Sequence, residues 1–200
     1  MTTDLCLTRA EIAALLWALG LVPFPVRYVS RLQWDMLSRD IRQLHRLDAR
    51  RHLDRIERLV EKHLDDFNRP CGLEVLTGSV SSAVAVNAWS AQGELWVYQH
   101  LLETPMVLET DCGMFFLYRH PGRLVATRHH WITESPRPTF LRVFGDAGWV
   151  SVPPAAHAAI LEWPSVSTLP EFDPAWFRDD LGDECATERQ AKRRVLGRLR

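Results

Sequence analysis

The sequence is poor in lysine and carries almost no net charge. Only Lys62 and Lys192 are lysines among the 24 basic residues, and 25 acidic residues bring the formal net charge to -1. A chain this balanced has no overall field that attracts nucleic acid or an anionic membrane. We therefore expect no nucleic-acid partner, and the excess of arginine over lysine is most simply explained by a GC-rich genome.

Cysteines and long apolar runs are also scarce. The four cysteines, at positions 6, 71, 112 and 185, form no C-x-x-C pair, which argues against a zinc ribbon or a thiol-redox motif. Their low density favours reduced thiols in a cytoplasmic protein. The apolar stretch from Ile12 to Val26 lacks a basic flank and contains two prolines, and no run reaches the roughly 18 apolar residues of a membrane span. We expect a cytoplasmic protein with no membrane span.

Fingerprints of common catalytic sites are missing. The sequence contains no G-x-x-x-x-G-K-[ST], G-x-G-x-x-G, G-x-S-x-G or H-E-x-x-H. His129 and His130 are neighbours in a predicted strand, so their side chains point to opposite faces and do not easily bind one metal ion. We therefore predict no metal, no cofactor and no catalytic residue. An enzyme with an unmarked site stays an alternative, built from residues at strand ends and turns: His100, Glu109, Cys112, His120 and His130.

The first 70 residues show helical patterns. Thr8 and Glu11 form a capping box before an apolar helix that Gly20 ends, and the prolines that follow favour an extended segment with a short strand near 26–29. Apolar residues at three- and four-residue steps predict a long helix over 34–67, or a helical hairpin with a break near Asp48. Its arginines alternate with acids, which favours solvated pairs over a nucleic-acid patch.

Residues 71–152 are rich in strand patterns. We predict strands at 73–76, 83–89, 94–100, 106–108, 114–118, 123–132, 140–144 and 149–152. Gln92-Gly93 predicts a hairpin, Pro121-Gly122 predicts a type II turn, and the segment 146–148 predicts a turn joining the last two strands. Strands joined by such short turns are antiparallel.

Together these patterns predict one α+β domain over residues 1–200. Its parts are a helical N-terminal region (1–70) with a long helix or helical hairpin, a central antiparallel β-sheet (71–152) and C-terminal helices (153–200). In the last region acids precede bases from about Asp183 onward, which suits a helix dipole.

The eight tryptophans are the most distinctive feature of the composition. The predicted hairpin from Ala88 to Tyr98 places two of them on either side of its turn. They either pair across the strands over the core or form a partner-binding tip. The candidate binding residues are therefore Trp89, Gln92, Glu94 and Trp96.

Several segments resemble a known family. The opening Leu7-Thr8-x-x-Glu11 with Leu19-Gly20, the stretch Ala83 to Ala88, and the segment Asp146 to Val152 are similar to EspG-type chaperones of ESX (type VII) secretion. The resemblance implies an α+β fold with a central antiparallel sheet and helical bundles. It also implies a non-enzymatic cytosolic chaperone or adaptor for secreted PE–PPE-type substrates, without a cofactor. An antitoxin or immunity-type binding protein is a further alternative, and the sequence leaves the oligomeric state open.

Overall fold

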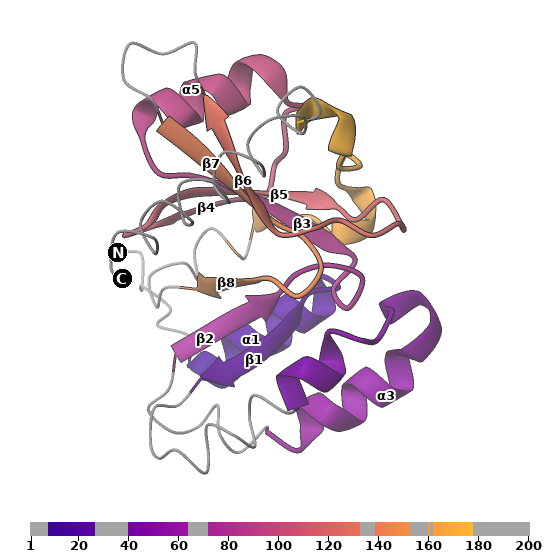
Figure 1. Ribbon diagram of the computed structural model, residues 1–200. Helices are drawn as coiled ribbons and strands as arrows, with labels where there is room; N and C mark the ends of the chain where they lie inside the picture. The colour runs from indigo at the N-terminus through magenta and orange to yellow at the C-terminus, as the bar shows by residue number, and fades with distance from the viewer. Residues whose placement is uncertain are drawn as a thin grey trace, which may run out of the picture.

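The computed structural model describes residues 8–26, 40–63, 72–132, 139–152, 160 and 162–177. In this part of the chain, antiparallel strands form two sheets, and helices pack against both (Figure 1). The predicted α+β fold is confirmed. The strands are nevertheless divided between two sheets, where the sequence suggested one central sheet.

The N-terminal helix begins as predicted. Thr8 caps α1 (Arg9–Ala18): its hydroxyl accepts a hydrogen bond from the Glu11 amide at 3.3 Å, and the Glu11 carboxylate accepts one from the Thr8 amide at 2.7 Å. Strand β1 (Val22–Val26) follows and lies earlier than the predicted strand at 26–29. It is an edge strand of the described sheet, paired with β2 on one side, so it tolerates two prolines that donate no hydrogen bond.

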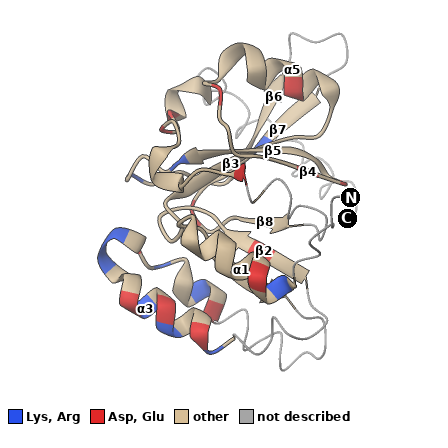
Figure 2. Cartoon of the chain, turned by 180° about the vertical axis from the view of Figure 1, so that it is seen from behind, with Lys and Arg blue, Asp and Glu red and all other residues tan. Residues whose placement is uncertain are grey.

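A helical hairpin follows, with its break at the predicted place. Residues 40–44 are helical, and Asp48 caps α3 (Ala49–Glu61) by accepting a hydrogen bond from the Arg50 amide at 2.8 Å. Acidic and basic residues are interleaved along α3 (Figure 2), as the sequence pattern indicates. The inner face of the hairpin packs on one face of the smaller sheet through Leu44, Ile56, Leu59 and Val60.

The smaller sheet has the order β1-β2-β8, and the larger has the order β4-β5-β3-β7-β6. All neighbours are antiparallel. The remaining strands are β2 (Gly72–Leu76), β3 (Ala83–Ala88), β4 (Val107–Thr110), β5 (Gly113–Arg119), β6 (Arg128–Ile132), β7 (Thr139–Phe144) and β8 (Trp149–Val152).

The predicted hairpin at Gln92-Gly93 is wrong, because this segment is the helix α5 (Ala91–His100). Ser90 caps the helix by accepting a hydrogen bond from the Gly93 amide at 3.2 Å. The buried positions Gly93, Val97 and Leu101 recur every four residues. This helical period outweighs the alternation that suggested a strand over 94–100.

Two other turns join different partners from those expected. Strands β7 and β8 are not a hairpin: the segment 145–148 carries the chain from the five-stranded to the three-stranded sheet. Gly122 has the positive φ of 76° that a type II turn requires. The connection through this turn, from β5 to β6, does not join neighbouring strands, because β3 and β7 lie between them in the sheet.

Three apolar clusters hold these layers together. One joins the inner faces of the two sheets to α1, a second lies between the five-stranded sheet, α5 and the 3₁₀ helix η3 (Pro174–Phe177), and the third lies under α3. A further 3₁₀ helix, η2 (Val166–Thr168), precedes η3. The helix predicted from Asp183 onward lies outside the described residues. Within those residues, no helix combines the length and apolar character that crossing a membrane requires.

Candidate functional site: an aromatic patch beside a cleft between the sheets

The predicted binding residues are separated in the structure. Trp89 directly follows β3 and is 49% exposed, whereas Trp96 is partly buried on α5. Trp96 stacks on His100 with ring centroids 4.5 Å apart and also contacts His130 at 5.1 Å. The two tryptophans do not pair, because their side chains lie on opposite faces of the five-stranded sheet. The other two predicted residues, Gln92 and Glu94, lie in the first turns of α5.

Trp89 instead belongs to an exposed cluster at one end of the five-stranded sheet. Phe140 of β7 lies at its centre, with ring centroids 5.8 Å from Trp89, 5.2 Å from Trp131 and 5.2 Å from His129. Trp131 is paired with Phe140 across the strands and is 42% exposed. Strand alternation places His129 and His130 on opposite faces, as predicted, and the structure shows that His129 and Trp131 are exposed and His130 is buried. We call Trp89, His129, Trp131 and Phe140 the aromatic patch.

A cleft of about 510 Å³ adjoins this patch, with Trp89 belonging to both. The five-stranded sheet and the β4–β5 turn supply one wall, and the three-stranded sheet supplies the other. Trp149 lies on the second wall and is 49% exposed. The walls include Leu73, Asn87, Phe115, Arg142, Phe144 and Val152. Exposed tryptophans therefore stand on both sides of a mainly apolar cleft.

Arg142 supplies positive charge to the cleft. Its guanidinium carbon lies 4.5 Å from the ring centroid of Phe144, within the range of a cation–π contact. Within the described residues, Arg142 forms no ion pair with a carboxylate. Its charge is therefore available to an anionic group that enters the cleft.

Asn87 fixes the shape of the cleft at its base. It is fully buried, and its amide nitrogen donates hydrogen bonds to the carbonyl oxygens of Cys112 at 3.1 Å and Met114 at 3.2 Å. Among the described residues, its side-chain oxygen has no hydrogen-bond partner. Glu74 also lines the cleft, and burial raises its pKa to about 7 against the opposing effect of a hydrogen bond with Ser151.

The residues of the alternative enzyme site do not converge. His100 and His130 flank Trp96, while His120 is hydrogen-bonded to Asp146. Cys112 is exposed in the β4–β5 turn, and Glu109 is exposed on β4. Among the residues that the structure describes, no group of three or more histidine, cysteine or acidic side chains has the arrangement of a metal site.

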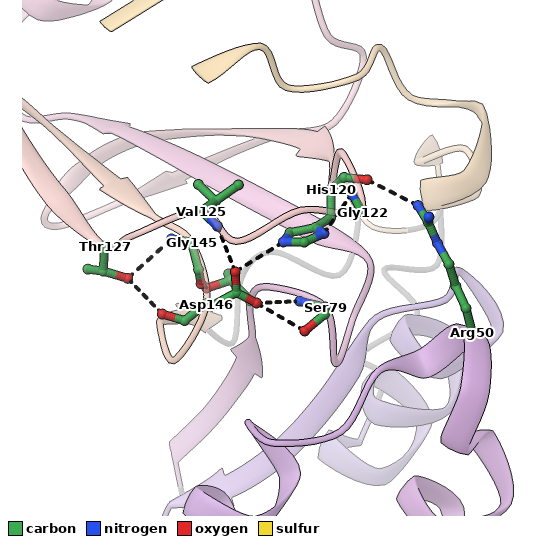
Figure 3. A network of polar contacts seen from close by, with 9 residues as sticks. Arg50, Ser79, His120, Gly122, Val125, Thr127, Gly145 and Asp146 are labelled. Atoms are coloured by element: carbon green, nitrogen blue, oxygen red, sulfur yellow. Dashed lines mark hydrogen bonds and ion pairs between the residues drawn. The ribbon is translucent and has the colours of Figure 1, made fainter. Parts of the chain in front are cut away.

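A partly buried polar network surrounds Asp146 (Figure 3), and no local sequence pattern predicts it. One carboxylate oxygen accepts hydrogen bonds from the amide and hydroxyl of Ser79, at 2.9 and 3.0 Å. The other accepts from the Val125 amide at 2.8 Å and from His120 Nε2 at 3.2 Å. The Gly122 amide donates to His120 Nδ1 at 3.1 Å, which places the hydrogen of the neutral ring on Nε2.

This network has a structural role. The Ser79 hydroxyl donates to Asp146, and the His120 ring is also bound to Asp146, so the histidine does not act as a base on the serine. The side chain of His120 is only 4% exposed. The carboxylate therefore joins two chain segments, the one at Ser79 and the one from His120 to Val125, to its own turn.

Two residues that line the cleft, Asn87 and Arg142, were not predicted as site residues, although local sequence patterns mark both of them. Asn87 is the one polar residue in the run Ala-Val-Ala-Val-Asn-Ala. Burying a side-chain amide in such a strand costs free energy unless the amide forms hydrogen bonds, so its presence indicates a specific contact. Arg142 alternates with buried Leu141 and Val143 and was readable as an outward position. The closeness of Trp131 and Trp89 depends on the order β3-β7-β6, which no local pattern predicts.

Comparison with known proteins adds no functional assignment. No protein-family model matches the chain, and no curated protein matches it either. The aromatic patch and its adjoining cleft are thus the features from which a function is inferred.

Proposed function

We propose that the protein is a non-enzymatic cytosolic chaperone or adaptor that binds another protein through the aromatic patch and cleft. The observation that carries this proposal is the exposure of Trp89 and Trp131 in one cluster, beside an apolar cleft whose far wall carries Trp149. The resemblance to EspG-type chaperones motivates the choice of partner, a secreted substrate of the PE–PPE type.

Burial of such a surface yields binding energy. Each tryptophan removes a large apolar area from water when covered, and aromatic residues dominate the energetic centres of protein interfaces. Trp89 and Trp131 already contact Phe140, so their rings are held in place before a partner arrives. A prearranged surface loses less conformational entropy on binding.

The partner surface that fits best is the apolar face of an amphipathic helix. Such a face covers a shallow aromatic patch, and one aromatic or aliphatic side chain can enter the cleft. An acidic residue beside that face would pair with Arg142, which is positioned over Phe144. An antitoxin or immunity protein uses the same chemistry, and the identity of the captured partner separates these cases.

The test is co-purification and measured affinity with a PE–PPE pair, comparing wild type with the double variant Trp89→Ala, Trp131→Ala. Loss of two interface tryptophans should weaken binding by about 1,000-fold, since each hot-spot aromatic contributes about 2 kcal/mol or more and 1.4 kcal/mol corresponds to a factor of ten. The circular dichroism spectrum should not change, because both side chains are about half exposed.

Leu95→Ala is the matched control, because Leu95 is 53% exposed on α5, across the sheet from the patch. It should bind like wild type. Unchanged affinity in the double tryptophan variant, or an equal loss in Leu95→Ala, contradicts the proposal. Trp96→Ala is a poor test of binding, because Trp96 packs against Phe177 and His130 and its loss affects stability.

A further inference from the structure

We infer that the helical hairpin of residues 40–61 holds a binding site for a diphosphate group. The feature that carries it is a hollow of about 610 Å³ between the two arms of the hairpin. Its lining consists of Arg42, Gln43, Arg46, Leu47, His52 and Arg55. We call it the arginine hollow.

Three guanidinium groups line the arginine hollow without a carboxylate. Arg42 and Arg46 come from the first arm and Arg55 from α3, so the break at Asp48 brings them around one space. Within the described residues, none of the three forms an ion pair. The sequence suggested that helical neighbours neutralise these arginines, and at this hollow they do not. The three positive charges repel each other, and a bound anion would offset this electrostatic repulsion.

Other arginines of the hairpin are engaged elsewhere. Arg58 donates a hydrogen bond to the carbonyl oxygen of Asp54 at 3.1 Å, and Arg50 donates to that of His120 at 3.2 Å. Neither lines the arginine hollow. The three lining arginines are therefore distinguished from Arg50 and Arg58 by having no partner among the described residues, and from all the other arginines of the hairpin by lining the hollow.

His52 adds a further donor. Its backbone leaves the helical region inside α3, with φ −134° and ψ 27°, and its Nδ1 accepts a hydrogen bond from the Asp48 amide at 3.3 Å. In the neutral ring the hydrogen therefore lies on Nε2. With the amide group of Gln43, the lining presents mostly hydrogen-bond donors. This composition suits an anion.

The number and placement of the donors favour a diphosphate over a single carboxylate. A guanidinium binds phosphate through two parallel hydrogen bonds, and a carboxylate plane accommodates fewer such groups than two linked phosphates do. Nucleic acid is a poorer fit, because acidic and basic residues are mixed along α3 (Figure 2), so the helix carries no extended basic surface. The diphosphate belongs either to a nucleotide or to a free inorganic ion.

Isothermal titration calorimetry of the full chain with inorganic diphosphate, ADP and AMP tests the site. We expect diphosphate and ADP to bind and AMP to bind at least about tenfold more weakly, because AMP offers one phosphate. Tighter binding of ADP than of diphosphate indicates a nucleotide, and equal binding indicates the free ion. The double variant Arg46→Gln, Arg55→Gln should lose at least about 100-fold in affinity, since each of the two charge-assisted contacts contributes about tenfold or more.

Arg51→Gln is the matched control: Arg51 is exposed on the same helix but does not line the hollow. It should bind diphosphate like wild type. The inference is overturned by absence of binding at millimolar diphosphate, by an equal loss in Arg51→Gln, or by binding of nucleic acid alone. The Trp89→Ala, Trp131→Ala variant should bind diphosphate normally, so failure here is separate from failure of the proposed protein-binding function.

Discussion

At the scale of single residues, Glu74 shows how burial changes the behaviour of a charge. It lies on β2 between Phe24 of β1 and Ser151 of β8. Burial raises its pKa from 4.5 to about 7. Because the folded-state pKa exceeds the ordinary value, the folded protein favours the neutral carboxyl. The stability this contributes is fully present below pH 4.5 and is lost as the pH rises through 7.

Glu74→Gln should therefore raise stability at pH 8 and change it little at pH 4.5. The neutral amide avoids burying a negative charge, and we expect a gain of about 1 kcal/mol, limited because the carboxyl is partly in contact with solvent. Urea unfolding at the two pH values measures the effect. Glu109→Gln, an exposed site on β4, should show no such pH dependence. A gain of equal size at both pH values would show that the charge of Glu74 is not its cause.

Local sequence rules succeeded at this scale. The capping box of Thr8 and Glu11, the break at Asp48 and the positive φ of Gly122 each depend on a few neighbouring residues. The role of Asp146 was not accessible in the same way. Its donors come from positions 79, 120 and 125, and a turn signature says nothing about such distant partners.

At the scale of elements, the β4–β5 hairpin depends on one glycine. Gly113 begins β5 with a φ of +94°, and a Cβ at this position would overlap the carbonyl oxygen of Ala88. Both the backbone conformation and the space exclude a side chain. Gly113 therefore holds β5 close to the end of β3, beside the cleft.

Gly113→Ala should lower the free energy of unfolding by about 2–4 kcal/mol, from backbone strain together with the steric overlap. Gly72→Ala is the matched control, because its Cβ would lie an ordinary 3.7 Å from the Val26 carbonyl oxygen and its φ is not positive. Its effect should stay below about 1 kcal/mol. Chemical denaturation of both variants measures the difference, and equal losses would contradict this account of the hairpin.

Helices and strands were predictable where the period of the apolar residues and the length of the segment indicated the same type of element. The strands expected at 73–76, 83–89, 114–118, 140–144 and 149–152 all appear, within a few residues of the expected ends. The strand predicted at 94–100 was wrong. Its short apolar pattern fits both the strand period of two and the helical period of 3.6, and Ser90 caps a helix there. The predicted cross-strand pair of Trp89 and Trp96 depended on that strand and was therefore also wrong.

At the scale of the whole molecule, the chain crosses between the two sheets at 77–82 and again at 145–148. The two crossings lie against each other: the Thr77 amide donates to the Gly148 carbonyl at 2.9 Å, and the Thr77 hydroxyl donates to that of Gly145 at 2.8 Å. Asp146 adds the Ser79 contacts and, through His120 and Val125, the β5–β6 connection. This non-local arrangement explains why one sheet was expected and two are observed.

Asp146→Asn should therefore destabilise the whole fold. The carboxylate accepts four hydrogen bonds, and an amide nitrogen in place of one oxygen leaves two donors without an acceptor, at a cost of about 2–4 kcal/mol. Urea unfolding at pH 7 measures this loss. Asp111→Asn, at an exposed turn position, should cost less than about 0.5 kcal/mol.

The pH dependence provides a second readout of the same variant. Burial alone would raise the pKa of Asp146, but hydrogen bonds from His120, Val125 and Ser79 hold it well below its usual range. The carboxylate thus stabilises the protein above its unfolded-state pKa of 3.8, and this contribution declines as the pH falls below that value. The gap between wild type and Asp146→Asn should narrow accordingly between pH 5 and pH 2. A constant gap would mean that packing at the two crossings, and not the charge of Asp146, holds the sheets together.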